Sequence, residues 1–207
     1  MALDFEKQFY NDKVKLIVGC DEAGRGCLLG DVFAGAVILP SDFQCDLIND
    51  SKQLSEKQRE EAYKIIVENA IAYGVGRCSP EEIDKMNILN ASREAMVRAI
   101  NNMNHKFDMV ITDAVKIKGL NVEVYPLIHG DALSLCVAAA SIIAKVSRDH
   151  YCLELDKKYP EYQIAKHKGY GTKIHMEALE KYGPKKGLYR FTYAPVKKYL
   201  IQKVSLF

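Results

Sequence analysis

Two short apolar runs near the N-terminus, joined by a glycine-rich segment, restrict the fold more than any other feature of this sequence. The runs span residues 15–20 (KLIVGC) and 32–39 (VFAGAVIL), and the segment DEAGRGCLLGD separates them. Apolar runs of this length that are bounded by turn residues are typical of buried strands. Because the connection is short, the pattern predicts two neighbouring antiparallel strands inside a mixed sheet.

Helical patterns alternate with strand patterns along the remaining chain. Ser55 with Gln58 and Ser79 with Glu82 have the spacing of capping boxes, which open helices. Residues 132–155 contain neither glycine nor proline, so we expect a long and largely buried helix there. The other expected elements are helices over about 55–70 and, with a break, 79–103, and strands over 72–78, 109–112 and 122–128. This alternation predicts an α/β fold with a mixed central sheet flanked by helices.

The length of 207 residues favours one domain over residues 1–207, with a basic helical portion and tail from about residue 160. Hydrophobic residues make up 48% and charged residues 27%, values that fit a globular protein and exclude a membrane protein. No apolar run approaches the ~18 residues of a membrane span, and the N-terminus lacks the apolar core of a signal peptide. The six cysteines form no C-x-x-C pair, so we expect reduced thiols and a cytoplasmic location.

Charge is divided unevenly along the chain, although the formal net charge is only +2. Residues 1–144 carry 15 basic and 21 acidic side chains, a net charge of −6. Residues 145–207 carry 14 basic and 6 acidic side chains, a net charge of +8. Such asymmetry predicts a surface for nucleic acid or for a membrane in the basic segment.

Four carboxylates stand at the expected ends of strands and helices. Asp21 and Glu22 follow the first strand directly, Asp113 closes the strand of residues 109–112, and Asp131 precedes the long helix. Taken separately, the first pair could be a solvated turn and Asp131 an N-cap. Adjacent acids repel unless a cation lies between them. If the sheet gathers all four, they form an oxygen-lined site suited to Mg²⁺ or Mn²⁺.

Phosphodiester hydrolysis is the chemistry that such a site supports. Two ions about 4 Å apart can stabilise the attacking and the leaving oxygens of an in-line displacement. One ion lowers the pKa of the attacking water, and the other neutralises charge on the departing 3′ oxygen. The alternative is a glycosidase with one protonated and one ionised carboxylate. That chemistry needs neither four acids nor a basic C-terminal segment.

Four segments in order carry a resemblance to a known family. They are DEAGRG at residues 21–26, NDSKQLS at 49–55, GDALSLCVAAASIIAKVSRD at 130–149 and HKGYGT at 167–172. The chain resembles prokaryotic ribonuclease HII, the type 2 ribonuclease H, from about Val14 to the APV tripeptide that ends at Val196. The resemblance implies a ribonuclease H-like α/β fold, a mixed central sheet flanked by helices, with a C-terminal helical portion.

The same resemblance implies an activity. Members of the family are metal-dependent endoribonucleases that hydrolyse the RNA strand of RNA/DNA hybrids. They also cut on the 5′ side of ribonucleotides embedded in duplex DNA, leaving 3′-hydroxyl and 5′-phosphate ends. The chain is therefore expected to be a monomer that uses Mg²⁺ or Mn²⁺, with two ions in the catalytic complex. Its expected roles are ribonucleotide removal and RNA primer removal in replication and repair.

The resemblance also implies roles for particular residues. Metal binding and catalysis fall on the four acids already identified: Asp21, Glu22, Asp113 and Asp131. The backbone of Gly24, Arg25 and Gly26 is expected to contact the ribose 2′-hydroxyl and a neighbouring phosphate, although a plain tight turn is the alternative. Tyr170 is expected to stack on a sugar or base, the alternative being a surface-loop tyrosine.

Three cationic residues are further candidates for contact with the substrate. Lys52, Lys145 and Arg148 are placed to support a phosphate or the active site, and each could instead serve a local ion pair. Two positions depart from the family pattern beside the acids. Ala114 follows Asp113 where glycine is frequent, and His129 stands where lysine is common. These departures bear on metal preference and pH optimum more than on the type of reaction.

The C-terminal residues QKVSLF, Gln202–Phe207, resemble tails that dock bacterial sliding clamps through two apolar anchors. The alternative is a frayed terminus that packs locally. Two other functions remain to be weighed against a ribonuclease. A junction resolvase could use four carboxylates on the same sheet, but it has no need of elements that recognise ribose. A nucleic-acid-binding protein with a vestigial acidic site would not need its carboxylates intact.

Overall fold

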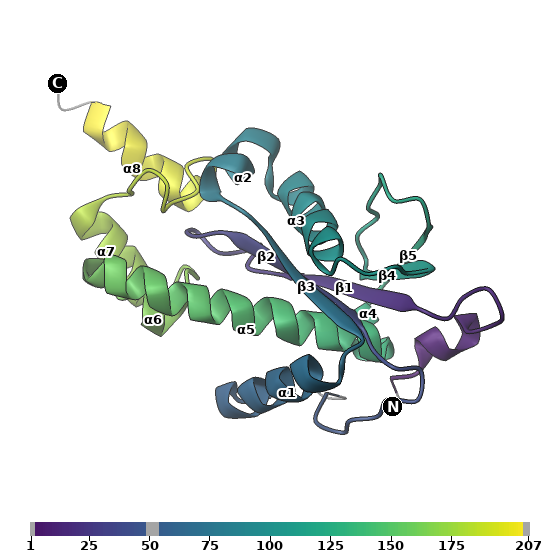
Figure 1. Cartoon of the computed structure of the whole chain (residues 1–207). Helices are drawn as coiled ribbons and strands as arrows, with labels where there is room; N and C mark the ends of the chain where they lie inside the picture. The colour runs from purple at the N-terminus through teal and green to yellow at the C-terminus, as the bar shows by residue number, and fades with distance from the viewer. Residues whose placement is uncertain (1–2, 49–53, 205–207) are drawn as a thin grey trace.

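A five-stranded sheet lies at the centre of the computed structural model, which describes residues 3–48 and 54–204 (Figure 1). The strand order is β3-β2-β1-β4-β5. Strands β1, β2 and β3 pair antiparallel, whereas β1, β4 and β5 pair parallel. The strands are β1 (Ile17–Ala23), β2 (Val32–Ile38), β3 (Ala72–Cys78), β4 (Met109–Asp113) and β5 (Glu123–Leu127). The expected mixed sheet with an antiparallel first pair is confirmed.

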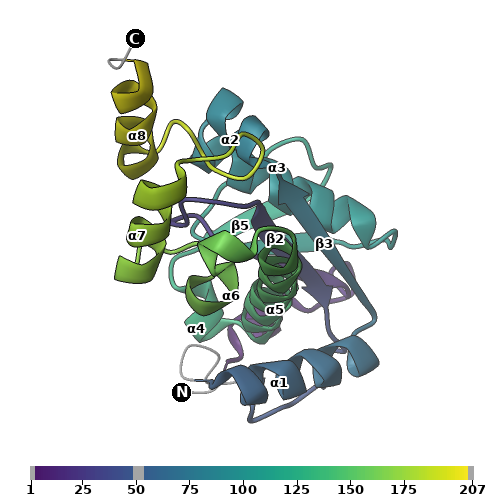
Figure 2. The ribbon, with the colours of Figure 1, turned by 90° about the vertical axis from the view of Figure 1, so that its left-hand side faces the viewer.

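Helices cover both faces of the sheet (Figures 1 and 2). One face is covered by α1 (Glu56–Asn69) and α5 (Leu135–Lys158), and the other by α2 (Pro80–Met86) and α3 (Ile88–Asn102). Glycines let α5 approach the strands closely, because a Cβ on Gly19 or Gly35 would collide with its main chain. The α/β class with flanking helices is therefore confirmed.

Helix starts follow the predicted capping boxes at Ser55 and Ser79, whose side chains accept hydrogen bonds from the main-chain N–H groups of Gln58 and Glu82. The expected break before residue 103 falls at Asn87, which has a φ of 69°. The long helix begins later than predicted. Ser134 adopts extended backbone and separates α4 (Gly130–Leu133) from α5, and its hydroxyl accepts from the N–H of Val137. The prediction of one continuous helix from residue 132 is therefore wrong.

Three site residues also lie differently from the expectation. Asp21 and Glu22 belong to β1 rather than following it, because the ladder to β2 continues through Ala23. Asp131 caps neither helix: it lies in the first turn of α4, whose N-cap is His129, while Ser134 caps α5. All three carboxylates consequently lie on regular, hydrogen-bonded backbone.

The C-terminal portion forms a second packed layer at one end of the sheet (Figures 1 and 2). Its elements are η3 (Pro160–Tyr162), α6 (Ile164–His167), α7 (Lys173–Tyr182) and α8 (Ala194–Val204). They enclose a small apolar core that includes Leu29, Tyr162, Leu179 and Tyr189. Leu29 comes from the β1–β2 connection, so this layer is joined to the strand end that carries the acids.

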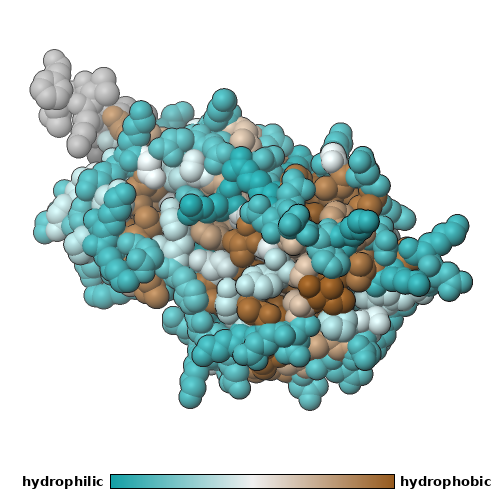
Figure 3. Space-filling model, in the orientation of Figure 1, coloured by the Kyte–Doolittle hydropathy of each residue, from teal (hydrophilic) through white to brown (hydrophobic). Residues whose placement is uncertain are grey.

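A short N-terminal segment, η1 (Phe5–Phe9), packs at the opposite end of α5. The buried Glu6 carboxylate accepts hydrogen bonds from the N–H groups of Leu135 and Cys136 in the first turn of α5. Polar residues dominate the rim of the face drawn in Figure 3, and apolar residues show between them. No helix within residues 3–48 and 54–204 combines the length and the apolar character that a membrane span needs. All six cysteines lie in this part of the chain and are free thiols.

Candidate active site

The strand register brings two of the four acids side by side. Cys20 of β1 pairs with Thr112 of β4 in parallel register, so that Asp21 and Asp113 are the next residues along neighbouring strands. Asp113 Oδ1 accepts a hydrogen bond from the N–H of Gly130 at 2.8 Å, which attaches the start of α4, and with it Asp131, to the end of β4. We call Asp21, Glu22, Asp113 and Asp131 the acidic cluster.

Burial and mutual repulsion disfavour negative charge in the acidic cluster. Burial, together with the charges of Glu22 and Asp113, raises the pKa of Asp21 well above its ordinary value. Burial also raises the pKa of Glu22, although Arg25 donates to Glu22 Oε1 at 2.8 Å and opposes the rise. A nearby cation would relieve this penalty for both carboxylates.

The donor set of the acidic cluster suits a hard divalent cation. Glu22 Oε2 is buried and has no hydrogen-bond partner among the described residues, so one lone-pair-bearing oxygen is available to a ligand. Within residues 3–48 and 54–204, no three His, Cys, Asp or Glu side chains are gathered closely enough to enclose a metal as they stand. A hard cation such as Mg²⁺ would accordingly be held by one or two of these carboxylates together with water.

A cleft of about 270 Å³ joins the acidic cluster to residues from four other segments. Glu22 and Asp131 line it together with Gly24, and Tyr170 and Lys145 line it from the C-terminal half of the chain. Carboxylates, a cation and an exposed aromatic ring thus face one space. Asp21 and Asp113 lie directly behind this lining, beside Glu22.

Two loops meet beside the cleft, residues 24–30 after β1 and residues 168–171 after α6. We call them the paired loops. Leu28 N–H donates to Gly169 O at 2.8 Å, and the Cys27 thiol lies 3.6 Å from Lys168 O. Gly24 has a φ of +94°, and a Cβ there would collide with the Arg148 side chain, so both conformation and space favour glycine. Gly26 has open space around it.

Arg148 is buried behind the paired loops rather than exposed to the cleft. Its guanidinium donates to the main-chain oxygens of Asp31, Lys168 and Leu29 at 3.2, 2.7 and 3.3 Å. These bonds connect the loop after β1 with the loop after α6. The structure therefore gives Arg148 a role in holding the loops.

Arg190 makes the complementary set of bonds, and nothing in the sequence had identified it. Its buried side chain donates through Nε to Gly30 O at 2.9 Å and through Nη1 to Gly24 O and Arg25 O at 2.8 and 3.0 Å. The Tyr193 hydroxyl donates to Arg25 O at 2.7 Å. The carbonyl groups of Gly24 and Arg25 therefore point inward, towards the C-terminal portion.

Tyr170 is the exposed member of the paired loops, with 45% of its surface accessible. Its N–H donates to His167 O at 2.9 Å, and Thr172 N–H donates to its carbonyl at 2.8 Å. A Cβ on Gly169 would lie within 3.1 to 3.2 Å of Arg148, Leu29 and Cys27, so the tyrosine is carried by a closely packed turn. Its exposed ring and fixed main chain suit contact with a ligand in the cleft.

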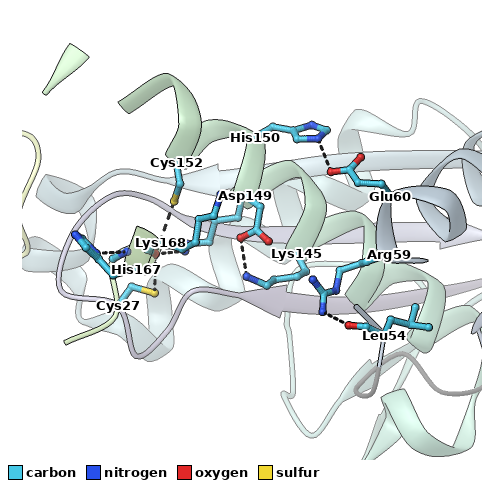
Figure 4. Close-up of polar contacts among 12 residues, drawn as sticks. Cys27, Leu54, Arg59, Glu60, Lys145, Asp149, His150, Cys152, His167 and Lys168 are labelled. Atoms are coloured by element: carbon cyan, nitrogen blue, oxygen red, sulfur yellow. Dashed lines mark hydrogen bonds and ion pairs between the residues drawn. The ribbon is translucent and has the colours of Figure 1, made fainter. Parts of the chain in front are cut away.

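Two cations face the acidic cluster across the cleft. The Lys145 ammonium lies 2.6 Å from Asp149 Oδ1, one turn along α5 (Figure 4). Arg59 of α1 lines the cleft and donates through Nη2 to Leu54 O at 2.8 Å (Figure 4). Arg59 carries no motif in the sequence and had not been identified either. Lys52 lies outside the described residues, so its position relative to this cleft is not described.

The arrangement combines a site for divalent cations with a rigid main-chain surface and flanking positive charge. Carboxylates of this kind could hold divalent ions, which would supply an activated water and stabilise an anionic leaving group. Main-chain groups approach a sugar closely only where side chains are absent, as at Gly24 and Gly26. Arg59 and Lys145 offer phosphate contacts. The cleft can therefore bind a nucleic acid backbone beside hydrolytic metal ions.

Comparison with known proteins agrees with this chemistry. The family model described as Ribonuclease HII matches residues 18–196. Ribonuclease HII from Acetivibrio thermocellus is 49% identical over 179 residues, which cover 86% of this chain and 70% of that protein. The structure of ribonuclease H2 from Pyrococcus horikoshii OT3 is similar with a TM-score of 0.77 and 27% identity, covering 90% of this chain and 98% of that one.

Two further solved structures share the fold at lower identity. One is the PCNA:RNase HII complex from Archaeoglobus fulgidus, with a TM-score of 0.72 and 23% identity over 86% of this chain and 95% of that one. The other is Bst-RNase HIII in complex with Mn²⁺, with a TM-score of 0.71 and 17% identity over 92% of this chain and 71% of that one. Both show that this arrangement of strands and helices is shared beyond close relatives.

Proposed function

The chain belongs to the ribonuclease HII family and is a ribonuclease H endonuclease, and we propose that it cuts on the 5′ side of ribonucleotides embedded in duplex DNA. The products are 3′-hydroxyl and 5′-phosphate ends, and RNA in RNA/DNA hybrids is hydrolysed by the same site. The observation that carries the proposal is that the acidic cluster and the paired loops adjoin one cleft. A junction resolvase would use the acids without the loops.

The acidic cluster is the proposed site of Mg²⁺ or Mn²⁺, with two ions in the catalytic complex. Asp21, Glu22, Asp113 and Asp131 would hold them, and the Mn²⁺ complex of Bst-RNase HIII is consistent with this choice of metal. Bound ions supply an activated water and neutralise charge on the departing 3′ oxygen. Because burial raises the pKa values of Asp21 and Glu22, a bound cation would favour the ionised form of both residues.

The paired loops are the proposed site of ribose recognition. Because a trans peptide directs its C=O and N–H to opposite sides, the inward carbonyls of Gly24 and Arg25 turn the N–H groups of Arg25 and Gly26 away from Arg190. These N–H groups can donate to the 2′-hydroxyl and the adjacent phosphate. Tyr170 stacks on the sugar or base at the same nucleotide. The 2′-hydroxyl is the group that distinguishes RNA from DNA.

Substrate binding extends onto the basic part of the chain. Lys145 and Arg59 flank the cleft and would contact phosphates. Lys52 is proposed to contact a phosphate as well, on the basis of the NDSKQLS segment at residues 49–55. The proposed form of the protein is a monomer with one catalytic domain. The proposed setting is ribonucleotide and primer removal in the cytoplasm.

A sliding clamp is a second proposed partner, through Gln202–Phe207. The side chains of this tail lie outside the described residues. The proposal is supported by its sequence and by the PCNA:RNase HII complex of a protein with the same fold. Deletion of residues 201–207 should abolish retention on an immobilised clamp while cleavage of a free duplex is unchanged. Unchanged retention would remove the tail from the proposal.

One cleavage assay tests the main proposal. Duplexes that are all DNA, that contain one ribonucleotide, or that pair a long RNA with DNA are compared at equal concentration with Mg²⁺ or with Mn²⁺. We expect no cutting of the first, cutting at the 5′ side of the ribonucleotide in the second, and cutting in the third. Cleavage of the all-DNA duplex, or of a four-way junction in preference, would favour a resolvase.

A further inference from the structure

Two buried histidines form a stack directly beneath Tyr170. His167 ends α6 and His175 lies in the first turn of α7, and their rings are 4.0 Å apart between centroids with an interplanar angle of 10°. His167 is 4% exposed and His175 is fully buried. Neither residue lines the cleft, and the proposed reaction assigns no role to either of them.

The hydrogen bonds of His167 determine its protonation. Nδ1 accepts from the N–H of Gly169 at 3.0 Å, so it carries no proton. Nε2 lies 2.9 Å from the carbonyl oxygen of Tyr162, which can only accept, so Nε2 carries the proton and donates. The ring is therefore a neutral imidazole that holds the main chain at Gly169, one residue before Tyr170.

The bonds of His175 determine the opposite tautomer. Nδ1 lies 2.9 Å from the carbonyl oxygen of Tyr170 and must donate to it. Nε2 then accepts from the hydroxyl of Tyr189, 3.1 Å away. His175 is also neutral, and it holds the main chain of Tyr170 itself. The Thr172 hydroxyl completes the turn by accepting from the N–H of His175.

The surroundings of the stack keep both rings uncharged. Burial lowers the pKa of His167, opposed by the charge of Asp156, and burial together with His167 lowers the pKa of His175 to about 4. The Tyr189 hydroxyl is the other titratable group that contacts the pair, whereas Tyr162 contacts His167 through its main-chain carbonyl and donates its hydroxyl to Gly183 O. A proton added to His167 Nδ1 would oppose the Gly169 N–H that it now accepts from.

We propose that His167 and His175 are positioning residues for Tyr170, whose main chain they fix from below through two complementary neutral tautomers. The inference rests on the proposed role of Tyr170 in contacting the ribonucleotide. The two imidazoles bind the N–H of Gly169 and the carbonyl of Tyr170. By fixing the main chain on both sides of the Tyr170 Cα, they direct its ring into the cleft without contacting the substrate themselves. The alternative is that the stack only fills the C-terminal core.

Two isosteric variants of His175 separate these possibilities. An Asn amide can reach the place of Nδ1, so His175→Asn retains the donor to Tyr170 O. A Gln amide reaches the place of Nε2 instead, so His175→Gln retains only the partner of Tyr189. We expect His175→Gln to lower the single-turnover cleavage rate by about 10- to 100-fold, the effect of a misplacement of about 1 Å, and His175→Asn to restore most of it. The metal concentration for half-maximal rate should be unchanged in both.

A double-mutant cycle with Tyr170 supplies the decisive measurement. If the histidine acts through Tyr170, His175→Gln should have almost no further effect on a Tyr170→Ala protein. If the two losses multiply, or if His175→Asn is as poor as His175→Gln, the stack only fills the core and the inference is overturned. Tyr189→Phe, which removes the donor to His175 Nε2 and keeps the ring, is taken through the same cycle should His175→Gln not fold.

The same experiment distinguishes failure of the inference from failure of the proposed function. A wild-type protein that does not cut the duplex with one ribonucleotide overturns the proposed function and this inference with it. A Tyr170→Ala protein as active as wild type overturns the inference and the proposed role of Tyr170, while the proposed cleavage activity stands.

Discussion

The acidic cluster and the paired loops adjoin the same cleft, but they are held in opposite ways. The acids are placed by strand register and by one bond to α4, and their carboxylates repel one another. The loops are placed by donors from buried arginines and histidines to their main-chain oxygens. In the first region a cation would stabilise the ionised carboxylates, whereas in the second the main-chain oxygens accept hydrogen bonds from buried side chains.

This difference indicates that the paired loops stabilise the fold, whereas the acidic cluster destabilises it. Burying like charges costs free energy that a cation can return, whereas satisfied main-chain carbonyls stabilise the fold without a ligand. Substitutions in the acidic cluster should therefore separate activity from stability. Substitutions behind the paired loops should damage both together.

The largest expected effect tests the acidic cluster with Asp21→Asn. Loss of a metal-binding carboxylate should lower the cleavage rate by more than about 100-fold. Because the pKa of Asp21 is raised above its ordinary value of 3.8, its ionisation destabilises the metal-free fold as pH rises through the raised pKa. The Asn variant should consequently melt at a higher temperature than wild type at pH 7 in EDTA.

The gain in melting temperature should shrink as pH falls towards 4, where Asp21 of the wild type holds its proton. Thermal unfolding followed by circular dichroism at several pH values measures this difference. Ile142→Val, at another residue that lines the cleft, is the control for a general effect of substitution there. A variant less stable than wild type at pH 7 would contradict the view that the acids are under repulsion.

The paired loops are tested by Arg190→Gln. Removal of the guanidinium takes the donor from the main-chain oxygen of Gly30 and leaves those of Gly24 and Arg25 with one donor each, which should cost about 3–5 kcal/mol of unfolding free energy. The cleavage rate should fall together with the stability, because the N–H groups of Arg25 and Gly26 are no longer held in the orientation that faces the substrate. Urea unfolding and the cleavage assay on the same preparation measure both losses.

Arg77→Gln is the matched control, since its side chain is 60% exposed and its contact with Asp31 is 3.6 Å long. It should change stability by less than about 1 kcal/mol. Equal losses in the two variants would show that the loops are not specially dependent on Arg190.

A smaller effect is expected for Arg59→Ala, which changes neither region directly. Loss of one phosphate contact should raise KM several-fold, leave kcat near wild type, and reduce the slope of log binding against log salt by about 0.9. Lys64→Ala, an exposed cation on the same helix, is the control and should leave the slope unchanged. A fall in kcat at constant KM would instead place Arg59 in the chemistry.

The smallest expected effect concerns Ala114, beside the acidic cluster. Ala114 follows Asp113 with a φ of +52°, a conformation that costs an alanine about 1–2 kcal/mol. Ala114→Gly removes this strain but loosens the unfolded chain, so a net gain of about 0.5–1 kcal/mol is expected from urea unfolding. Ala132→Gly, in the helix α4, should lose about 1 kcal/mol. A loss at both positions would show that the turn after Asp113 is unstrained.

Much of the fold follows from local patterns in the sequence. The five strand segments, the capping boxes at Ser55 and Ser79 and the helix break near Asn87 depend on neighbouring residues, and the structure has all of them. The adjacency of Asp21 and Asp113 required only that two strand ends share an edge. The start of α5 was misplaced because Ser134 stops the helix inside an otherwise helical run.

The contacts behind the paired loops could not be predicted in this way. Arg190 and Gly24 are 166 positions apart, and no periodicity links them. Arg59 sits on an ordinary amphipathic helix, and only the packing of α1 against α5 brings it to the cleft. The sequence shows where His167 and His175 occur in the chain, but it does not show their tautomers. The tautomers depend on carbonyl and hydroxyl groups that come together only after folding.

The bond from Arg190 to Gly24 also has a consequence for the order in which the protein becomes active during synthesis. The ribosome completes the acidic cluster when it adds Asp131, but the donor that orients the loop after β1 emerges 59 residues later, at Arg190. A nascent chain that holds its metal ligands therefore still lacks the surface that selects ribose. We expect cleavage of ribonucleotide-containing duplexes to begin only after Arg190 has been translated and has docked against Gly24.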